Sequence, residues 1–162
     1  MKSLRTGLLT FALAAAIGFQ PTAQAATATT TMAVTATVLA TCIVLATPLI
    51  FGNYSGAQLD AQASVTVTCT LGTPFVVRLD PGAGSGATVA TRTLSFGANT
   101  LNYTIYRDAG HTQLWGQTDG TDTVAGTGAL LPSILTAYGR IPASQFAAPG
   151  AYLDTVGVTV VY

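Results

Sequence analysis

The sequence predicts an all-β domain, and three observations support this fold class. After residue 25 the chain contains neither Glu nor Lys, which commonly cover exposed helix faces, whereas Thr, Val, Ala and Gly dominate. Several short segments alternate apolar and polar residues with a period of two. Turn-forming residues separate these segments at the spacing of a β-sandwich or barrel. With 49% hydrophobic residues, the chain is expected to fold.

The first 25 residues have the three regions of a secretory signal peptide. Lys2 and Arg5 precede an apolar run from Leu8 to Phe19, and Ala23-Gln24-Ala25 closes the segment. The run is shorter than the roughly 20 residues that cross a bilayer. We therefore expect cleavage after Ala25, export of one domain formed by residues 26–162, and no direct membrane insertion.

The charged residues of the mature chain are few and slightly acidic. Four Arg and six Asp follow residue 25, which gives a net charge of 4 − 6 = −2. A nucleic-acid-binding surface needs clustered basic residues. The sequence therefore argues against a nucleic-acid partner.

Strand-like segments follow one another along the chain. In the first, the apolar face carries Met32, Val34, Ala36, Val38, Ala40 and Cys42, and mostly Thr occupies the other face. The alternation returns at residues 64–69 and 156–162. Between them, turn residues bound five further candidates: Pro48–Phe51, Phe75–Leu79, Thr91–Phe96, Leu101–Arg107 and Leu135–Ile141. Seven or eight strands result.

The connections between these segments are predicted to be turns. Residues 80–86 and 119–128 are polar and glycine-rich, and we interpret both as surface loops. The first lacks the Gly-Lys-Ser/Thr ending of a phosphate-binding loop.

The two cysteines, Cys42 and Cys69, are expected to form a disulfide. An even number of cysteines after an export signal favours a disulfide in an oxidising compartment. Both stand on the apolar side of alternating segments, and bonded cysteines have Cα atoms about 4.4 to 6.8 Å apart. A metal pair would need further ligands, and the chain has one His.

The polar residues predict neither an enzyme nor a cofactor or metal site. His111 lies in a polar stretch, and the chain has no nucleophile elbow to accompany it, so we interpret it as a turn residue. Asp119 and Asp122 lack the repeated Asp pattern and closing Glu of a calcium loop. Next to glycine, aspartates more often form turns.

Several motifs in a fixed order resemble one family. The first half contributes Met32 to Cys42, Phe51-Gly52-Asn53-Tyr54 and Val65 to Cys69. The second half contributes Arg92, Leu101 to Asp108, Leu114-Trp115-Gly116, Tyr138 to Pro142 and Gly150 to Tyr162. Together they resemble the spore coat protein U domain family over essentially all of the mature chain. That family includes subunits of Csu-type archaic chaperone-usher pili of Gram-negative bacteria.

The resemblance implies an incomplete immunoglobulin-like β-sandwich that lacks its last strand. A periplasmic chaperone would first fill the vacant groove, an outer-membrane usher would serve export, and the N-terminal strand of another copy would then complete the sandwich. Residues 26–40 match this donor strand, and the side chains expected to insert are Met32, Val34, Ala36 and Val38. The acceptor edge, which would also bind the chaperone, is expected at Val156, Val158, Val160 and Tyr162.

The function implied by the resemblance is a structural subunit of a surface fimbrium that supports adhesion or biofilm formation. One domain favours a shaft or minor subunit over a two-domain tip adhesin. The alternative is a secreted carbohydrate-binding β-sandwich or a surface-coat protein. Aromatic residues that could line a sugar-binding face are Trp115, Tyr54, Tyr103, Tyr106, Tyr138, Tyr152 and Tyr162. Several lie in strand-like segments, where aromatic side chains ordinarily fill the core.

Overall fold

The computed structural model describes residues 23–162, so most of the expected signal peptide, residues 1–22, lies outside the described chain. The chain divides into two units, with the boundary between Ala36 and Thr37. In the first unit, residues 23–36 have no helix or strand, and their side chains are exposed. Within residues 23–162 no helix is long and apolar enough to cross a membrane.

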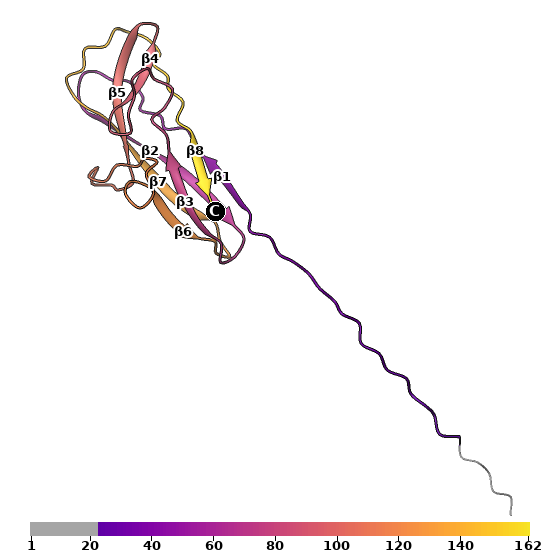
Figure 1. Cartoon of the computed structure of the whole chain (residues 1–162). Helices are drawn as coiled ribbons and strands as arrows, with labels where there is room; N and C mark the ends of the chain where they lie inside the picture. Colours follow the sequence, from indigo (N-terminus) through magenta and orange to yellow (C-terminus); the bar gives the residue numbers. More distant parts are fainter. Residues whose placement is uncertain (1–22) are drawn as a thin grey trace, which may run out of the picture. The chain divides into compact units, whose positions relative to one another are not determined.

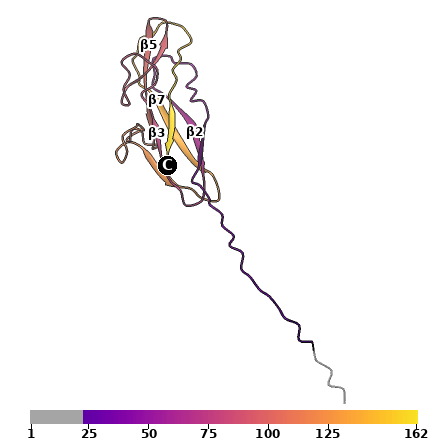
Figure 2. The ribbon, with the colours of Figure 1, turned by 45° about the vertical axis from the view of Figure 1, so that its right-hand side comes forward.

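Eight strands in the second unit form two sheets, which confirms the all-β class (Figure 1). Their bounds are β1 Cys42–Ala46, β2 Leu59–Cys69, β3 Pro74–Leu79, β4 Arg92–Phe96, β5 Asn99–Tyr106, β6 Val124–Thr127, β7 Ser133–Ile141 and β8 Val158–Val161. One sheet has the order β1-β2-β7-β5-β4 and the other the order β6-β3-β8, with antiparallel pairing throughout. In Figure 2 the yellow β8 crosses in front of the orange β7, as expected for a sandwich of two layers.

The core lies between the sheets because alternate residues of their strands point inward. The five-stranded sheet contributes Val65 and Val67, and the three-stranded sheet contributes Phe75, Val77 and Leu79, all in one buried cluster. Trp115 completes this cluster from a loop, fully buried, and its indole N–H donates to the Val77 carbonyl at 3.1 Å. The sandwich therefore has a continuous apolar interior.

A buried arginine is the main polar feature of this interior. Arg92 has no exposed surface, and its guanidinium donates to the carbonyl oxygens of Leu79, Asp80, Val89 and Trp115 at 2.8–3.3 Å. Desolvation lowers the pKa of Arg92. These four bonds satisfy the buried guanidinium, and they tie the end of β3 to the Trp115 loop.

Three strand expectations differ from the structure. The run from Met32 forms no strand before Cys42, the first residue that pairs with β2. Pro48–Phe51 is also outside any strand. Conversely, β6 lies where a loop was expected: it pairs with β3, and Gly126 leaves the space that the Phe75 ring occupies. Pairing with a neighbour, which a single segment cannot reveal, decided each case.

Candidate functional site

The candidate site is formed by the two neighbouring unpaired edges of the first and last strands of the sandwich, which together we call the groove. Strand β1 pairs with β2 alone, and β8 pairs with β3 alone. These two edges belong to different sheets, yet β8 lies between β3 and β1 in Figure 1, and the two strands are close in space. The sandwich is therefore open along one side, where each strand presents unpaired backbone N–H and C=O groups.

Inward-pointing side chains of both edges remain partly exposed. Val44 of β1 and Val158 and Val160 of β8 pack against the core but are only half-buried. By contrast, Val65 and Val67 of β2, which has a neighbour on each side, are at most 2% exposed. The difference follows from the missing neighbour, since within residues 23–162 no strand pairs with the outer edge of β1 or of β8.

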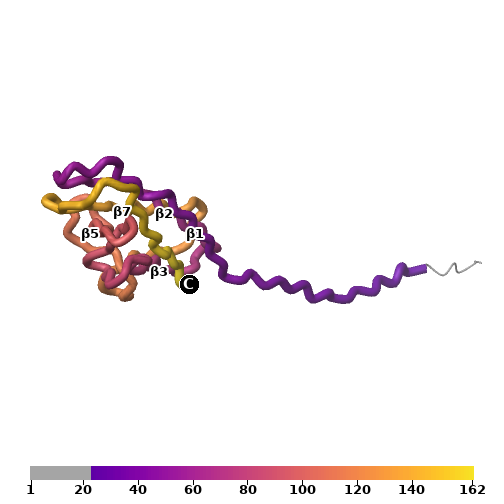
Figure 3. Tube along the Cα trace, turned by 90° about the horizontal axis from the view of Figure 1, so that it is seen from above, coloured from indigo at the N-terminus to yellow at the C-terminus, as the bar shows by residue number. Residues whose placement is uncertain are grey.

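A cleft of about 1150 Å³ lies between the segment that follows β1 and the segment that precedes β8. Its walls are residues 49–56 and 144–153, and Leu94, Leu101 and Ile141 contribute to its floor. Figure 3 shows the two walls, one purple and one yellow, side by side. One wall of the cleft therefore follows β1 in the chain, and the other wall precedes β8.

The first wall is held by aromatic and glycine contacts. The Phe51 ring meets the Tyr103 ring edge-on with centroids 5.8 Å apart, and Leu49 and Phe51 lie against Gly139 of β7, where any Cβ would overlap them. Ile50, Leu153 and Phe146 project outward from the walls and are at least 74% exposed. The cleft therefore has an apolar border, while its lining includes polar residues such as Asn53 and Gln145.

A disulfide between Cys42 and Cys69 anchors the start of β1. The two residues are directly opposite in register, and their Cα atoms are 4.1 Å apart, slightly less than the expected 4.4 to 6.8 Å. Thr70, the next residue, donates its N–H to the Thr41 carbonyl at 2.9 Å. Cys42 and Cys69 are therefore a non-hydrogen-bonded pair, in which antiparallel strands approach most closely.

The residues expected to donate a strand belong to a different environment. Met32, Val34 and Val38 are 86%, 84% and 81% exposed, and Ala36 is also exposed. None of them is in a strand. These residues alternate with mostly polar neighbours along the chain, but the apolar face that they form is not buried.

The residues expected to form the acceptor edge lie in and next to the last strand. Val158 and Val160 lie in β8, Val156 precedes it, and Tyr162 follows it with 58% of its surface exposed. The inward alternation extends further back than expected, to Asp154 and Tyr152. Sequence reasoning missed the walls of the cleft. The period-two pattern running from Tyr152 to Val160 is the signal that could have revealed the second wall.

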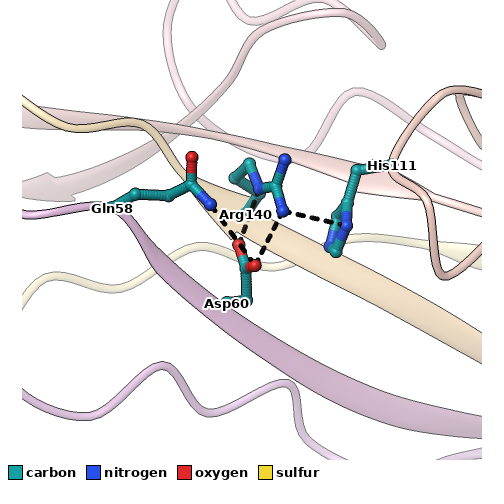
Figure 4. A network of polar contacts seen from close by, with 4 residues as sticks. All are labelled: Gln58, Asp60, His111 and Arg140. Atoms are coloured by element: carbon teal, nitrogen blue, oxygen red, sulfur yellow. Dashed lines mark hydrogen bonds and ion pairs between the residues drawn. The ribbon is translucent and has the colours of Figure 1, made fainter.

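The single histidine belongs to a surface network on β2 and β7 (Figure 4). Arg140 forms two 2.7 Å hydrogen bonds to Asp60 and donates through Nη2 to His111 Nδ1 at 3.1 Å. The Arg140 guanidinium lowers the pKa of Asp60. His111 lies in a turn with φ of 54° and contacts the rings of Tyr106 and Tyr138 edge-on. These contacts fasten the turn to the sheet.

The other candidate residues also have structural partners. Asp119 pairs with Arg78, and Asp122 accepts the Thr118 N–H at 2.6 Å. Within residues 23–162 no three His, Cys, Asp or Glu side chains gather as metal ligands. Trp115 and Tyr103 are core residues, so neither can stack on a sugar. Tyr54 and Tyr152 instead line the cleft.

Comparison with known proteins agrees with this architecture. Residues 28–159 match the family model described as Spore Coat Protein U domain. The curated "Protein U" of Myxococcus xanthus is 34% identical over 181 aligned positions, with both chains covered in full. A solved chaperone–tip adhesion subunit pre-assembly complex, CsuC–CsuE from the archaic chaperone-usher Csu pili of Acinetobacter baumannii, superposes with a TM-score of 0.59 at 23% identity. That match covers 78% of this chain but only 41% of the solved one, and it shows a shared fold.

Proposed function

Because this chain belongs to the spore coat protein U domain family, we propose that it is a structural subunit of a surface fibre built by donor-strand exchange. In this proposal, residues 26–40 of one copy fill the groove between β1 and β8 of the next copy. The subunit reaches the cell surface through the periplasm, with a chaperone and an outer-membrane usher as partners. The resulting fimbrium supports adhesion or biofilm formation, and the chain acts as a building block rather than an enzyme.

One observation carries the proposal: two adjacent sheet edges are unpaired, and the valines beneath them are half-buried. Val44, Val158 and Val160 would become fully covered by a single added strand. Such a strand would pair its backbone with β1 and β8 and place every second side chain over the core. An incomplete sandwich completed by another copy explains this side of the molecule.

The N-terminal segment has the pattern that such a groove requires. Met32, Val34, Ala36 and Val38 fall on one face, and three of the four are more than 80% exposed. Burying them at about 25 cal/mol per Å² would contribute on the order of 5 to 8 kcal/mol before ordering costs. The backbone ladder and the completed core supply the remaining stabilisation.

An open edge also explains the need for a chaperone. An apolar edge with unpaired backbone groups pairs readily with other chains and leads to aggregation unless something covers it. The solved relative with the shared fold is a tip adhesion subunit in complex with its chaperone before assembly. We propose that a chaperone covers the segment from Val156 to Tyr162 until a donor strand replaces it.

A surface coat is the second candidate, and the name of the family model is the observation that favours it. Strand exchange between copies could build a coat layer as well as a fibre. The exposed segment of residues 26–40 and the unpaired edges are compatible with either assembly, and electron microscopy of assembled material separates the two forms.

The experiment that tests strand exchange follows the mature chain by size-exclusion chromatography over a range of concentrations. We expect multimers that resist dilution, together with fibres by negative-stain electron microscopy. A synthetic peptide of residues 26–40, added in excess before assembly, should cap the grooves and leave monomer–peptide complexes. A chain that stays monomeric at every concentration and ignores the peptide contradicts the proposal.

A further inference from the structure

Two aspartates join the loop after β3 to the segment before β8 by reciprocal hydrogen bonds. Asp80 Oδ1 accepts the Gly157 N–H at 2.9 Å, and Asp154 Oδ1 accepts the Ala83 N–H at 2.8 Å. The Asp80 N–H also donates to the Gly157 carbonyl at 3.1 Å. We call this arrangement the aspartate clamp. The loop, expected to be a loose surface turn, is thus tied to the last strand of the domain.

The backbone around the clamp is shaped for close approach of the carboxylates. Gly82 has φ of 89°, and a Cβ at this position would overlap the Asp154 carboxylate. A Cβ at Gly157 would likewise overlap the carboxylate of Asp80. Each aspartate therefore packs on a glycine of the other segment. Any larger residue at Gly82 or Gly157 would collide with the carboxylate, so both positions require glycine.

A buried tyrosine completes the clamp from the core side. The Tyr103 hydroxyl donates to Asp154 Oδ2 at 2.7 Å. Burial, together with the neighbouring carboxylate, raises the pKa of Tyr103, so the hydroxyl keeps its proton. Asp154 thus has partners on both oxygens, although it lies between the apolar Tyr152 and Val156 on the inward face.

The clamp lies where the segment before β8 passes from one sheet to the other. Leu153 exchanges two backbone hydrogen bonds with Ser95 of β4, at 2.9 and 3.1 Å, and Val158 begins the pairing with β3. Residues 154–157 between these points are outside any strand. The clamp holds this crossing segment to the loop after β3 through the bonds at Gly157 and Asp154.

We propose that the aspartate clamp positions the last strand as a ready acceptor before a donor arrives, an inference that rests on the proposed strand exchange. Strand β8 has four residues and pairs with β3 alone, so few backbone hydrogen bonds hold it without a second attachment. A binding site that is formed only part of the time loses affinity in proportion to that fraction. The clamp raises the fraction of molecules whose groove is formed.

The experiment measures donor association in the full mature chain that carries Val34→Asp, which disables its own donor segment. A fluorescent peptide of residues 26–40 is the probe, and stopped-flow mixing gives its association and dissociation rates. Asp154→Ala should slow association about tenfold, the change expected from losing hydrogen bonds to a charged group. Dissociation should stay the same, because a bound donor itself holds β8 in place. Asp154→Asn, which keeps an oxygen for the Ala83 N–H, should recover most of the rate.

The control is Asp108→Ala, which removes a carboxylate that accepts backbone N–H groups of Thr112 and Gln113 in a turn remote in sequence from the clamp. It should leave both rates unchanged. If Asp154→Ala does not fold, Tyr103→Phe removes one clamp bond and should slow association about threefold. Association as fast as in the Asp108→Ala control, in either clamp variant, overturns the clamp. No peptide binding to the parent Val34→Asp chain overturns the proposed strand exchange itself, and the clamp with it.

Discussion

Cys42 and Cys69 are opposite each other at one end of the β1–β2 pair, and their disulfide lies beside one rim of the groove. It closes a loop across a sequence separation of 27 residues. Strand β1 has five residues and a single neighbour, so this covalent bond is its firmest attachment to the sheet. The disulfide therefore affects both the stability of the domain and the shape of the groove.

Removal of the disulfide should destabilise the domain strongly. The chain-entropy model gives about 3.6 kcal/mol for a loop of this length, against a typical domain total of about 5 to 15 kcal/mol. We expect Cys42→Ala combined with Cys69→Ala to lower the free energy of unfolding by about that amount in urea titrations. Reducing agent should have the same effect on the wild type and none on the double variant. An unchanged urea midpoint after complete reduction would argue against a stabilising disulfide.

A charge placed on the donor segment should block assembly only if it lies on the face of the segment that points into the groove. Val34→Asp would place a carboxylate in the apolar groove, where an unpaired charge is costly, whereas Thr35→Asp would point it away. We expect fibres from Thr35→Asp and monomers from Val34→Asp, scored by electron microscopy and light scattering. Deletion of residues 26–35 should also leave monomers. Equal assembly by the two point variants contradicts the inward assignment of Val34.

The same comparison on the last strand tests the acceptor edge. Val160 is half-buried toward the core, and Thr159 beside it is exposed. Val160→Asp should abolish binding of the 26–40 peptide, whereas Thr159→Asp should retain it, and circular dichroism checks that both variants fold. Deletion of residues 158–162 should abolish chaperone binding once a chaperone is identified. Peptide binding that survives Val160→Asp would place the groove elsewhere.

The Asp60–Arg140 pair should stabilise the domain above acidic pH. Because Arg140 lowers the pKa of Asp60, this contribution is present above the unfolded pKa of about 3.9 and is lost as pH falls through the lower, folded value. The Asp60 side chain is 42% exposed, so solvent screening limits the coupling to about 0.5 kcal/mol. A double-mutant cycle with Asp60→Asn and Arg140→Gln should give this coupling at pH 6 and almost none at pH 2. Equal coupling at both pH values would rule out an ionic origin.

Export should produce a mature protein that begins at Ala26. The apolar run is short, and a small-residue site ends at Ala25. N-terminal sequencing of protein recovered from the periplasm or the cell surface should read Ala-Thr-Ala-Thr. Recovery of chains that begin at Met1 contradicts cleavage.

The all-β class and the identity of the inward faces were predictable from the sequence. Residues such as Ala63, Val65 and Val67 alternate with polar neighbours, and a period of two suffices to place them on the core side of a strand. The positions of most strands were predictable from the same alternation. Strand β6 was not predictable, because Val124–Thr127 is a strand only through its pairing with β3.

The groove was decided by the tertiary structure alone. Local sequence pattern cannot reveal that β1 and β8, which are more than 100 residues apart in the chain, end as adjacent unpaired edges, nor that residues 49–56 and 144–153 face each other across a cleft. The aspartate clamp depends in the same way on a loop and a strand that are distant in sequence. A period of two determines which way a side chain points, but long-range packing determines which neighbour it meets and which edge has none.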